Sequence, residues 1–110
     1  MGLFDFLKST DINEGVKNCA ATPGAVLLDV RNPDEYAAGH IPGSINLPLP
    51  MIAEAAKRIP DKSAPLFVYC LTGGRSRSAV SALRAMGYAK PVNIGGIRAW
   101  RGEIEKSLFP

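Results

Sequence analysis

The sequence has few of the residues that build disulfide frameworks or metal sites. Its 110 residues include two cysteines and one histidine. Cys19 and Cys70 alone cannot make a disulfide framework, and together with His40 they show no metal-ligand spacing. We therefore expect no metal and no other cofactor.

Long apolar segments are also missing. No stretch could span a bilayer, and the chain does not start with the basic and apolar regions of a signal peptide. Phe6 stands where a myristoylation signal needs Ser or Thr. These absences predict a protein of a soluble, reducing compartment, the cytoplasm by default, with no membrane partner.

The charge of the chain is unevenly distributed. The net charge is +3, but residues 1–70 hold six basic against eight acidic residues, and residues 71–110 hold seven against two. The basic half favours a small anionic substrate. Nucleic acid is a possible but less favoured partner, because the basic residues form no dense run and have no aromatic platform beside them.

Short apolar segments alternate with amphipathic ones, which is typical of α/β proteins. The expected strands are residues 25–30, 44–47, 66–69 and 92–94, with 3–7 as an edge strand or a short helical turn. The expected helices are residues 12–21 with Asp11 as N-cap, a short one from Pro33 with Asn32 as N-cap, 51–59, 76–86 and 97–104. We therefore predict one domain over residues 1–110, an α/β three-layer sandwich. Its central, mainly parallel sheet of about five short strands should have helices on both faces.

Residues 66–78 combine a strand, a glycine loop and the start of a helix. Residues 66–69 are apolar and aromatic, the glycine pair at 73–74 ends the strand, and apolar residues recur at helical spacing after Ser76. This pattern places Cys70 at the carboxyl end of a strand, just before a tight loop that enters a helix.

Cys70 is the candidate nucleophile. Backbone N–H groups of a glycine-rich turn can point into one concavity, and a helix N-terminus adds partial positive charge. Such a cup binds anions and stabilises a thiolate, which lowers a thiol pKa from about 8.5. The alternative is a small apolar core residue. Cys19 is expected to be a core residue of this kind, with a resolving thiol for Cys70 as the alternative.

Three motifs resemble those of a known family, in the family's order. They are Asp29-Val30-Arg31 followed by Glu35-Tyr36 and residues 39–46, then residues 70–76, and finally Gly95-Gly96-Ile97 with Trp100. The chain resembles the single-domain rhodanese-like sulfurtransferases from about residue 11 to residue 103.

The resemblance implies a cycle in which Cys70 takes a sulfane sulfur from a donor and becomes a persulfide. The donor would be a small anion such as thiosulfate, or another persulfide, and the acceptor cyanide, a thiol or a protein. The persulfide would be cradled by the loop residues Leu71, Thr72, Gly73, Gly74 and Arg75. Asp29, Arg31, His40 and Ser76 would support this loop or orient the donor, and His40 is as well explained by a structural role.

Two features leave alternatives open. Leu71 and Thr72 stand where many family members carry more polar residues, which favours a donor less charged than thiosulfate. Four residues separate Cys70 from Arg75, whereas cysteine phosphatases need five residues between their cysteine and arginine, so this loop should be too tight for phosphate.

A module of this fold that only carries sulfur or binds an unidentified protein partner would keep the same residues.

Overall fold

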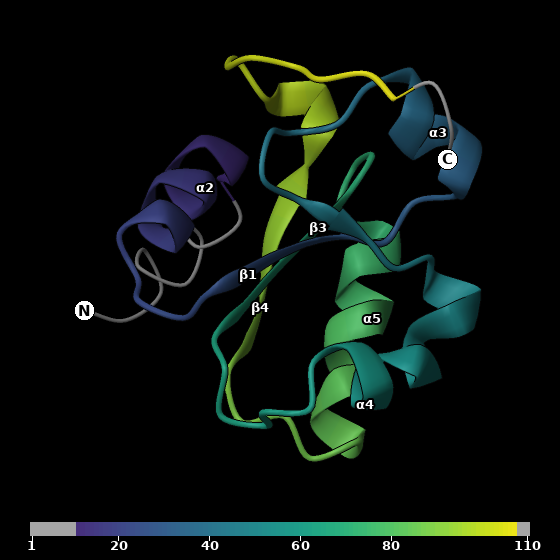
Figure 1. The fold of residues 1–110 in the computed structure, drawn as a ribbon. Helices are drawn as coiled ribbons and strands as arrows, with labels where there is room; N and C mark the ends of the chain where they lie inside the picture. Colours follow the sequence, from purple (N-terminus) through teal and green to yellow (C-terminus); the bar gives the residue numbers. More distant parts are fainter. Residues whose placement is uncertain (1–10, 108–110) are drawn as a thin grey trace.

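The computed structural model describes residues 11–107, which form a parallel sheet between two layers of helices (Figure 1). The elements, in chain order, are α2 (Ile12–Ala20), β1 (Val26–Asp29), α3 (Pro33–Ala38), β2 (Ile45–Asn46), η1 (Leu49–Glu54), α4 (Ala55–Arg58), β3 (Leu66–Cys70), α5 (Gly74–Ala85), β4 (Pro91–Gly96) and η2 (Ile97–Ala99). Within the described residues, no helix is both long and apolar enough to cross a membrane.

The sheet has four strands in the order β2-β1-β3-β4, and every pairing is parallel. The predicted α/β architecture with a mainly parallel sheet is confirmed, with four strands in place of about five. The fifth expected strand, residues 3–7, lies outside the described residues. Parallel pairing brings the carboxyl ends of β1, β3 and β4 to one edge, where Asp29 pairs with Tyr69 and Cys70 with Gly96.

Each face of the sheet has its own apolar core, because successive side chains of a strand point to opposite faces. Leu28, Val68 and Cys70 pack with α4 and α5 on one face. Leu27 and Tyr69 pack with α2 on the other. Figure 1 shows α2, in purple, across the sheet from α4 and α5. Helices therefore cover both faces, as the sequence predicts.

The two predicted N-caps stand at the starts of α2 and α3. The Asp11 carboxylate accepts a hydrogen bond from the backbone N–H of Asn13 at 3.0 Å. Asn32 and Glu35 form a capping box, in which Glu35 accepts from the backbone N–H of Asn32 at 2.9 Å, and Pro33 occupies the first helical position. α3 therefore starts at a fixed point, and this places Glu35 in its first turn.

The expected helix over residues 51–59 is wrong in part. Residues 49–54 are a 3-10 helix with a non-helical residue at Met51, and only Ala55–Arg58 is α-helical. Met51, with a φ of −109° and a ψ of 19°, lies outside the helical region, so the α-helix starts only at Ala55. Ile52 and Ala55 still turn inward as expected, but Ala56 is exposed.

The expected closing helix over residues 97–104 is also wrong. It is a single 3-10 turn, Ile97–Ala99, and Trp100 is extended with a ψ of 133°. The Trp100 indole donates to the carbonyl of Glu103 at 2.8 Å, so the chain folds back on itself instead of continuing the helix. Trp100 nevertheless packs against the α2-side core, as predicted for an anchor.

Gly96 permits the closest approach between β4 and the loop after β3. A Cβ at this position would overlap the backbone carbonyl oxygen of Leu71 and crowd the Cα of Thr72. These are backbone atoms, so neither can move aside without displacing the loop. Glycine at position 96 therefore sets where residues 71–72 lie.

We predict that Gly96→Ala lowers the free energy of unfolding by about 2 kcal/mol or more, the cost of overpacking a tight contact. Gly74→Ala is the matched control, because nothing lies within 4 Å of a Cβ there and α5 begins at this residue. It should change stability by less than about 1 kcal/mol. Urea unfolding measures both, and equal losses would contradict the assigned role of Gly96.

Candidate active site

The Cys70 sulfur lies at the carboxyl end of β3, facing the loop that connects this strand to α5. The backbone N–H of Gly73 donates to Sγ at 3.0 Å, and the Ser76 hydroxyl lies 3.4 Å from it. Cys70 is only 1% exposed. The sulfur is therefore more enclosed than an anion site open to solvent would be. Hydrogen-bond donors nevertheless face it, as the sequence predicts.

Two opposing effects set the pKa of Cys70. Burial raises it and is the largest single effect. Hydrogen bonds from the side chain and backbone of Ser76 and from the backbone of Gly73 and Thr72 lower it, and together they outweigh burial, so the pKa lies below its ordinary value. The loop therefore favours the thiolate, which is the nucleophilic form.

Gly73 shapes the loop. Its φ of 111° lies in the region that favours glycine, and α5 begins at the next residue. The turn directs the Gly73 N–H towards the sulfur of Cys70, which lies three residues earlier in the chain. The N-terminus of α5, with its partial positive charge, starts beside that sulfur.

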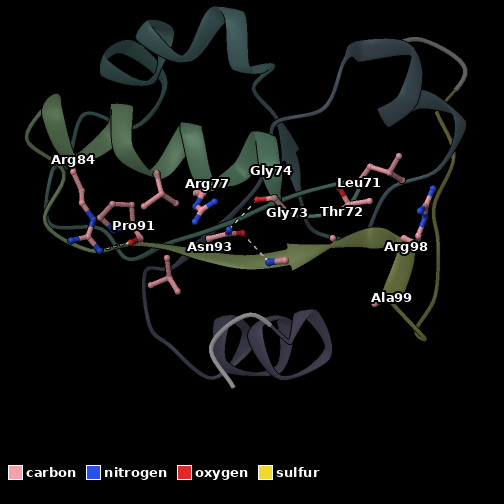
Figure 2. Close-up of a pocket in the computed structure, with 14 residues that line it drawn as sticks. Leu71, Thr72, Gly73, Gly74, Arg77, Arg84, Pro91, Asn93, Arg98 and Ala99 are labelled. Atoms are coloured by element: carbon pink, nitrogen blue, oxygen red, sulfur yellow. Dashed lines mark hydrogen bonds between the residues drawn. The ribbon is translucent and has the colours of Figure 1, made fainter. Parts of the chain in front are cut away.

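Asn93 of β4 ties the loop to the sheet, and the sequence analysis did not identify it. Its amide donates to the Gly73 carbonyl at 3.1 Å, and its oxygen accepts from the Gly95 N–H at 2.9 Å (Figure 2). The same oxygen also accepts from the Ser76 hydroxyl at 2.7 Å. A polar residue inside an apolar strand segment was the available signal for it.

The Ser76 hydroxyl has one hydrogen but three acceptors within reach. They are Cys70 Sγ, the Gly73 carbonyl at 3.1 Å and the Asn93 side-chain oxygen at 2.7 Å. A neutral thiol can donate its own hydrogen to Ser76, whereas a thiolate can only accept one. Ser76 can therefore donate to Asn93 or Gly73 when Cys70 is neutral, and to Sγ when Cys70 is a thiolate.

Arg75 forms a two-bond ion pair with Glu35 of α3, at 2.7 and 3.1 Å. The hydrogen bond from Arg75 is the largest effect on Glu35 and lowers the Glu35 pKa to about 2. The hydrogen bond to Glu35 likewise raises the pKa of Arg75, with a smaller contribution from the charge of Cys70. The guanidinium thus fastens the loop to α3, and Glu35 is a partner that sequence reasoning did not single out for the site.

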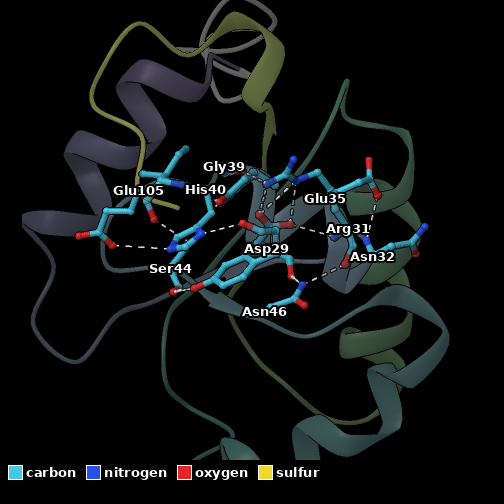
Figure 3. Close-up of polar contacts among 12 residues, drawn as sticks. Asp29, Arg31, Asn32, Glu35, Gly39, His40, Ser44, Asn46 and Glu105 are labelled. Carbon is cyan, nitrogen blue, oxygen red and sulfur yellow. Dashed lines mark hydrogen bonds and ion pairs between the residues drawn. The ribbon is translucent and has the colours of Figure 1, made fainter. Parts of the chain in front are cut away.

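Asp29 and Arg31 form a buried ion pair beside this site. Arg31 donates to the Asp29 carboxylate at 2.7 and 3.1 Å and to the Gly39 carbonyl at 2.6 Å (Figure 3). Their side-chain bonds hold the segment after α3. The structure therefore places this pair next to the strand that carries Cys70, without a hydrogen bond to the 71–75 loop.

His40 is engaged away from Cys70. Its ring stacks on Tyr36 with centroids 3.7 Å apart, Nδ1 lies 2.8 Å from the Tyr36 carbonyl, and Nε2 lies 3.6 Å from the Glu105 carboxylate. The backbones of His40 and Glu105 also exchange two hydrogen bonds of 2.8 Å. These contacts fasten the segment after η2 to α3 and match the structural role.

Cys19 lies on α2 and packs against the α2-side core, whereas Cys70 belongs to the core on the opposite face of the sheet. The sheet separates the two sulfurs, which argues against Cys19 as a resolving thiol. Among the described residues, no three His, Cys, Asp or Glu side chains gather as a group that could bind a metal ion.

Comparison with known proteins gives a consistent picture. A family model described as a rhodanese-like domain matches residues 13–103. Thiosulfate sulfurtransferase PspE of Escherichia coli (strain K12) is 40% identical over 72 residues, 64% of this chain and 69% of that protein. Putative sulfur carrier protein YrkF of Bacillus subtilis (strain 168) is 32% identical over 80 residues, 72% of this chain and 43% of that protein.

Solved structures share the fold. One described as rhodanese with anions from E. coli superimposes with a TM-score of 0.70 at 36% sequence identity. The superposition covers 76% of this chain and 99% of that chain.

We predict that Ser76→Ala raises the pKa of Cys70 and lowers the thiolate fraction at neutral pH severalfold, because the hydrogen bond to the anion is lost. The measurement is the ultraviolet absorbance of the thiolate against pH in a Cys19→Ala background, where Cys70 is the only thiol. Ser78→Ala, an exposed change on the same helix, is the control. An unchanged titration in Ser76→Ala would refute the role of the hydroxyl.

We predict that Glu35→Gln destabilises the protein in a pH-dependent way. The folded-state pKa of Glu35 is about 2, below its ordinary value of 4.5, so the ion pair contributes fully above pH 4.5 and is lost as the pH falls towards 2. The stability difference between wild type and variant should therefore shrink over that range, measured by urea unfolding. Glu54→Gln, on an exposed residue with no salt bridge among the described residues, is the control and should change the free energy of unfolding by less than about 0.5 kcal/mol.

Proposed function

This chain belongs to the family of rhodanese-like domains, and from that premise we propose that it transfers sulfane sulfur through a persulfide on Cys70. Named relatives support a sulfurtransferase or sulfur-carrier activity. The observation that carries the proposal is the Cys70 sulfur under the Gly73 N–H at 3.0 Å and the Ser76 hydroxyl at 3.4 Å.

In the first step, the Cys70 thiolate attacks the outer sulfur of the donor. A new S–S bond forms as the donor's own S–S bond breaks, and the leaving group departs with the electron pair, as sulfite when the donor is thiosulfate. No external oxidant is needed. Loop N–H groups that stabilise the thiolate are positioned to stabilise the negative charge of the persulfide as well.

In the second step, a thiophilic acceptor attacks the outer sulfur and releases the Cys70 thiolate. The acceptor is cyanide, a thiol or a protein nucleophile. The charge on Cys70 is thus the same before and after the cycle, so one arrangement of donors serves both steps. The ion pair between Arg75 and Glu35 keeps that arrangement fixed.

The donor is a small anion or a persulfide. Backbone N–H groups that face Cys70 Sγ, such as that of Gly73, favour an anionic donor, whereas the charge of Arg75 is paired with that of Glu35. Leu71 and Thr72, next to the cysteine, offer few polar contacts and favour a donor less charged than thiosulfate. Since the cycle needs Cys70 as a free thiol, we place it in a reducing compartment such as the cytoplasm.

A sulfur carrier is the second candidate. Cys70 is 1% exposed, which favours slow exchange with small molecules and delivery by a docked protein. A carrier would load one sulfur and release it only to its partner, whereas a catalyst would turn over with small donors and acceptors.

We predict that incubation with thiosulfate or polysulfide adds one sulfur atom to the wild-type chain, because the hydrogen bonds of the loop lower the pKa of Cys70 and so favour its nucleophilic form. Intact mass spectrometry measures the gain, and cyanide or a reductant should reverse it. Cys70→Ser should gain nothing, and Cys19→Ala should load like the wild type. Absence of a Cys70 adduct with every donor would defeat the proposal.

The same preparation separates the two candidates. Release of thiocyanate in excess over protein, with thiosulfate and cyanide, identifies a catalyst. A single sulfur per chain that small acceptors remove only slowly identifies a carrier.

A further inference from the structure

A groove of about 900 Å³ runs between α5 and β4 and ends at the loop after Cys70. Apolar residues of both elements, including Val80 and Val92, line it, and residues 71–74 line the end next to the loop. Figure 2 shows β4 beneath α5, with Leu71 and Thr72 at the end opposite Arg84. The groove therefore leads along the sheet to the edge of the proposed active site.

Three exposed arginines line this groove, and none of the described residues that line it is acidic. Within residues 11–107, Arg77 and Arg98 form no salt bridge, while Arg84 only donates to the Pro91 carbonyl at 3.3 Å. Arg75 differs, because Glu35 neutralises it. No carboxylate of residues 11–107 therefore forms a salt bridge with these three arginines, and their positive charge favours an anionic occupant.

The spacing of the arginines indicates an extended occupant. Arg77 and Arg84 are seven residues apart on α5, roughly 10 Å along the helix axis at about 1.5 Å per residue. Arg98 adds a positive charge at the end of the groove next to the Cys70 loop, where its backbone N–H donates to the Leu71 carbonyl at 3.1 Å. A single small anion would contact only one end of this series.

The strand side of the groove suits a polypeptide. In the described part of the chain, β4 pairs only with β3, so its outer edge can accept another strand. Among residues 11–107, no aromatic residue lines the groove, which disfavours single-stranded nucleic acid, whose bases need stacking surfaces. The chain's own residues 1–10 hold one acidic and one basic residue and do not match the charge.

We propose that this groove binds an extended, acidic segment of a partner protein along β4, with the segment's end at the Cys70 loop. The partner would be the protein that exchanges sulfur with Cys70, and this part of the inference rests on the proposed function. The binding itself does not depend on sulfur chemistry and can be tested without it.

The test uses the full chain carrying Cys70→Ser, so that binding is measured without sulfur transfer. The probe is a fluorescent peptide of alternating Glu and Val, about eight residues long to cover β4 at about 3.3 Å per residue. It should bind more tightly than a Lys/Val peptide of equal length. Binding should weaken as salt rises from about 0.05 to about 0.5 M, because exposed charges are screened.

Paired charge reversals locate the site. Arg77→Glu with Arg98→Glu should weaken binding about tenfold or more. Lys17→Glu with Lys57→Glu, exposed residues outside the groove, makes the same change in net charge and should alter affinity less than about twofold. Thermal unfolding verifies that all variants fold. Amide NMR shifts on adding the peptide should follow β4 and α5 and leave α2 unchanged.

Three results would overturn the inference. The first is no preference for the acidic peptide, and the second is an equal loss of binding in both double variants. The third is tighter binding of an oligonucleotide of the same charge. If wild-type Cys70 loads sulfur and one of these results is found, the docking proposal fails alone. If the peptide binds but Cys70 never loads, only the proposed function fails.

Discussion

The hydrogen bonds between the Cys70 sulfur and the loop that follows it are the interaction on which the site depends. Cys70 is almost fully buried, and an isolated buried thiol would hold its proton. The donors on Gly73 and Ser76 reverse that balance. Distant features of the chain serve this contact, since Asn93 ties the loop to β4 and Gly96 lets the loop lie against the same strand.

Two ion pairs connect the segments around Cys70, and each joins a different pair of segments. Asp29 and Arg31 are buried and connect β1 to the segment after α3, whereas Arg75 and Glu35 are partly exposed and connect the loop to α3. Both guanidiniums look like anion ligands in the sequence, yet each has a carboxylate partner. Arg77, Arg84 and Arg98, which have no such partner in residues 11–107, lie in the neighbouring groove, where their positive charge can meet a second molecule.

Local sequence patterns predicted the fold correctly where a single signal, an apolar run or a helix cap, dominated. The apolar runs identify β1 and β3, and the caps at Asp11 and Asn32 locate α2 and α3. Prediction failed where a local backbone conformation overrode the apolar spacing, as at Met51, or where a side-chain hydrogen bond did so, as at Trp100. In the site, the cysteine loop was visible as contiguous residues. Glu35 and Asn93 were not assigned, because their contacts join segments 40 and 20 residues apart.

The most direct measurement is a crystal structure of the sulfur-loaded protein. The account predicts a second sulfur bonded to Cys70 Sγ, within about 3.5 Å of backbone nitrogens of the loop, and the Arg75–Glu35 pair intact. A second sulfur surrounded by apolar side chains, with the loop nitrogens directed elsewhere, would contradict it.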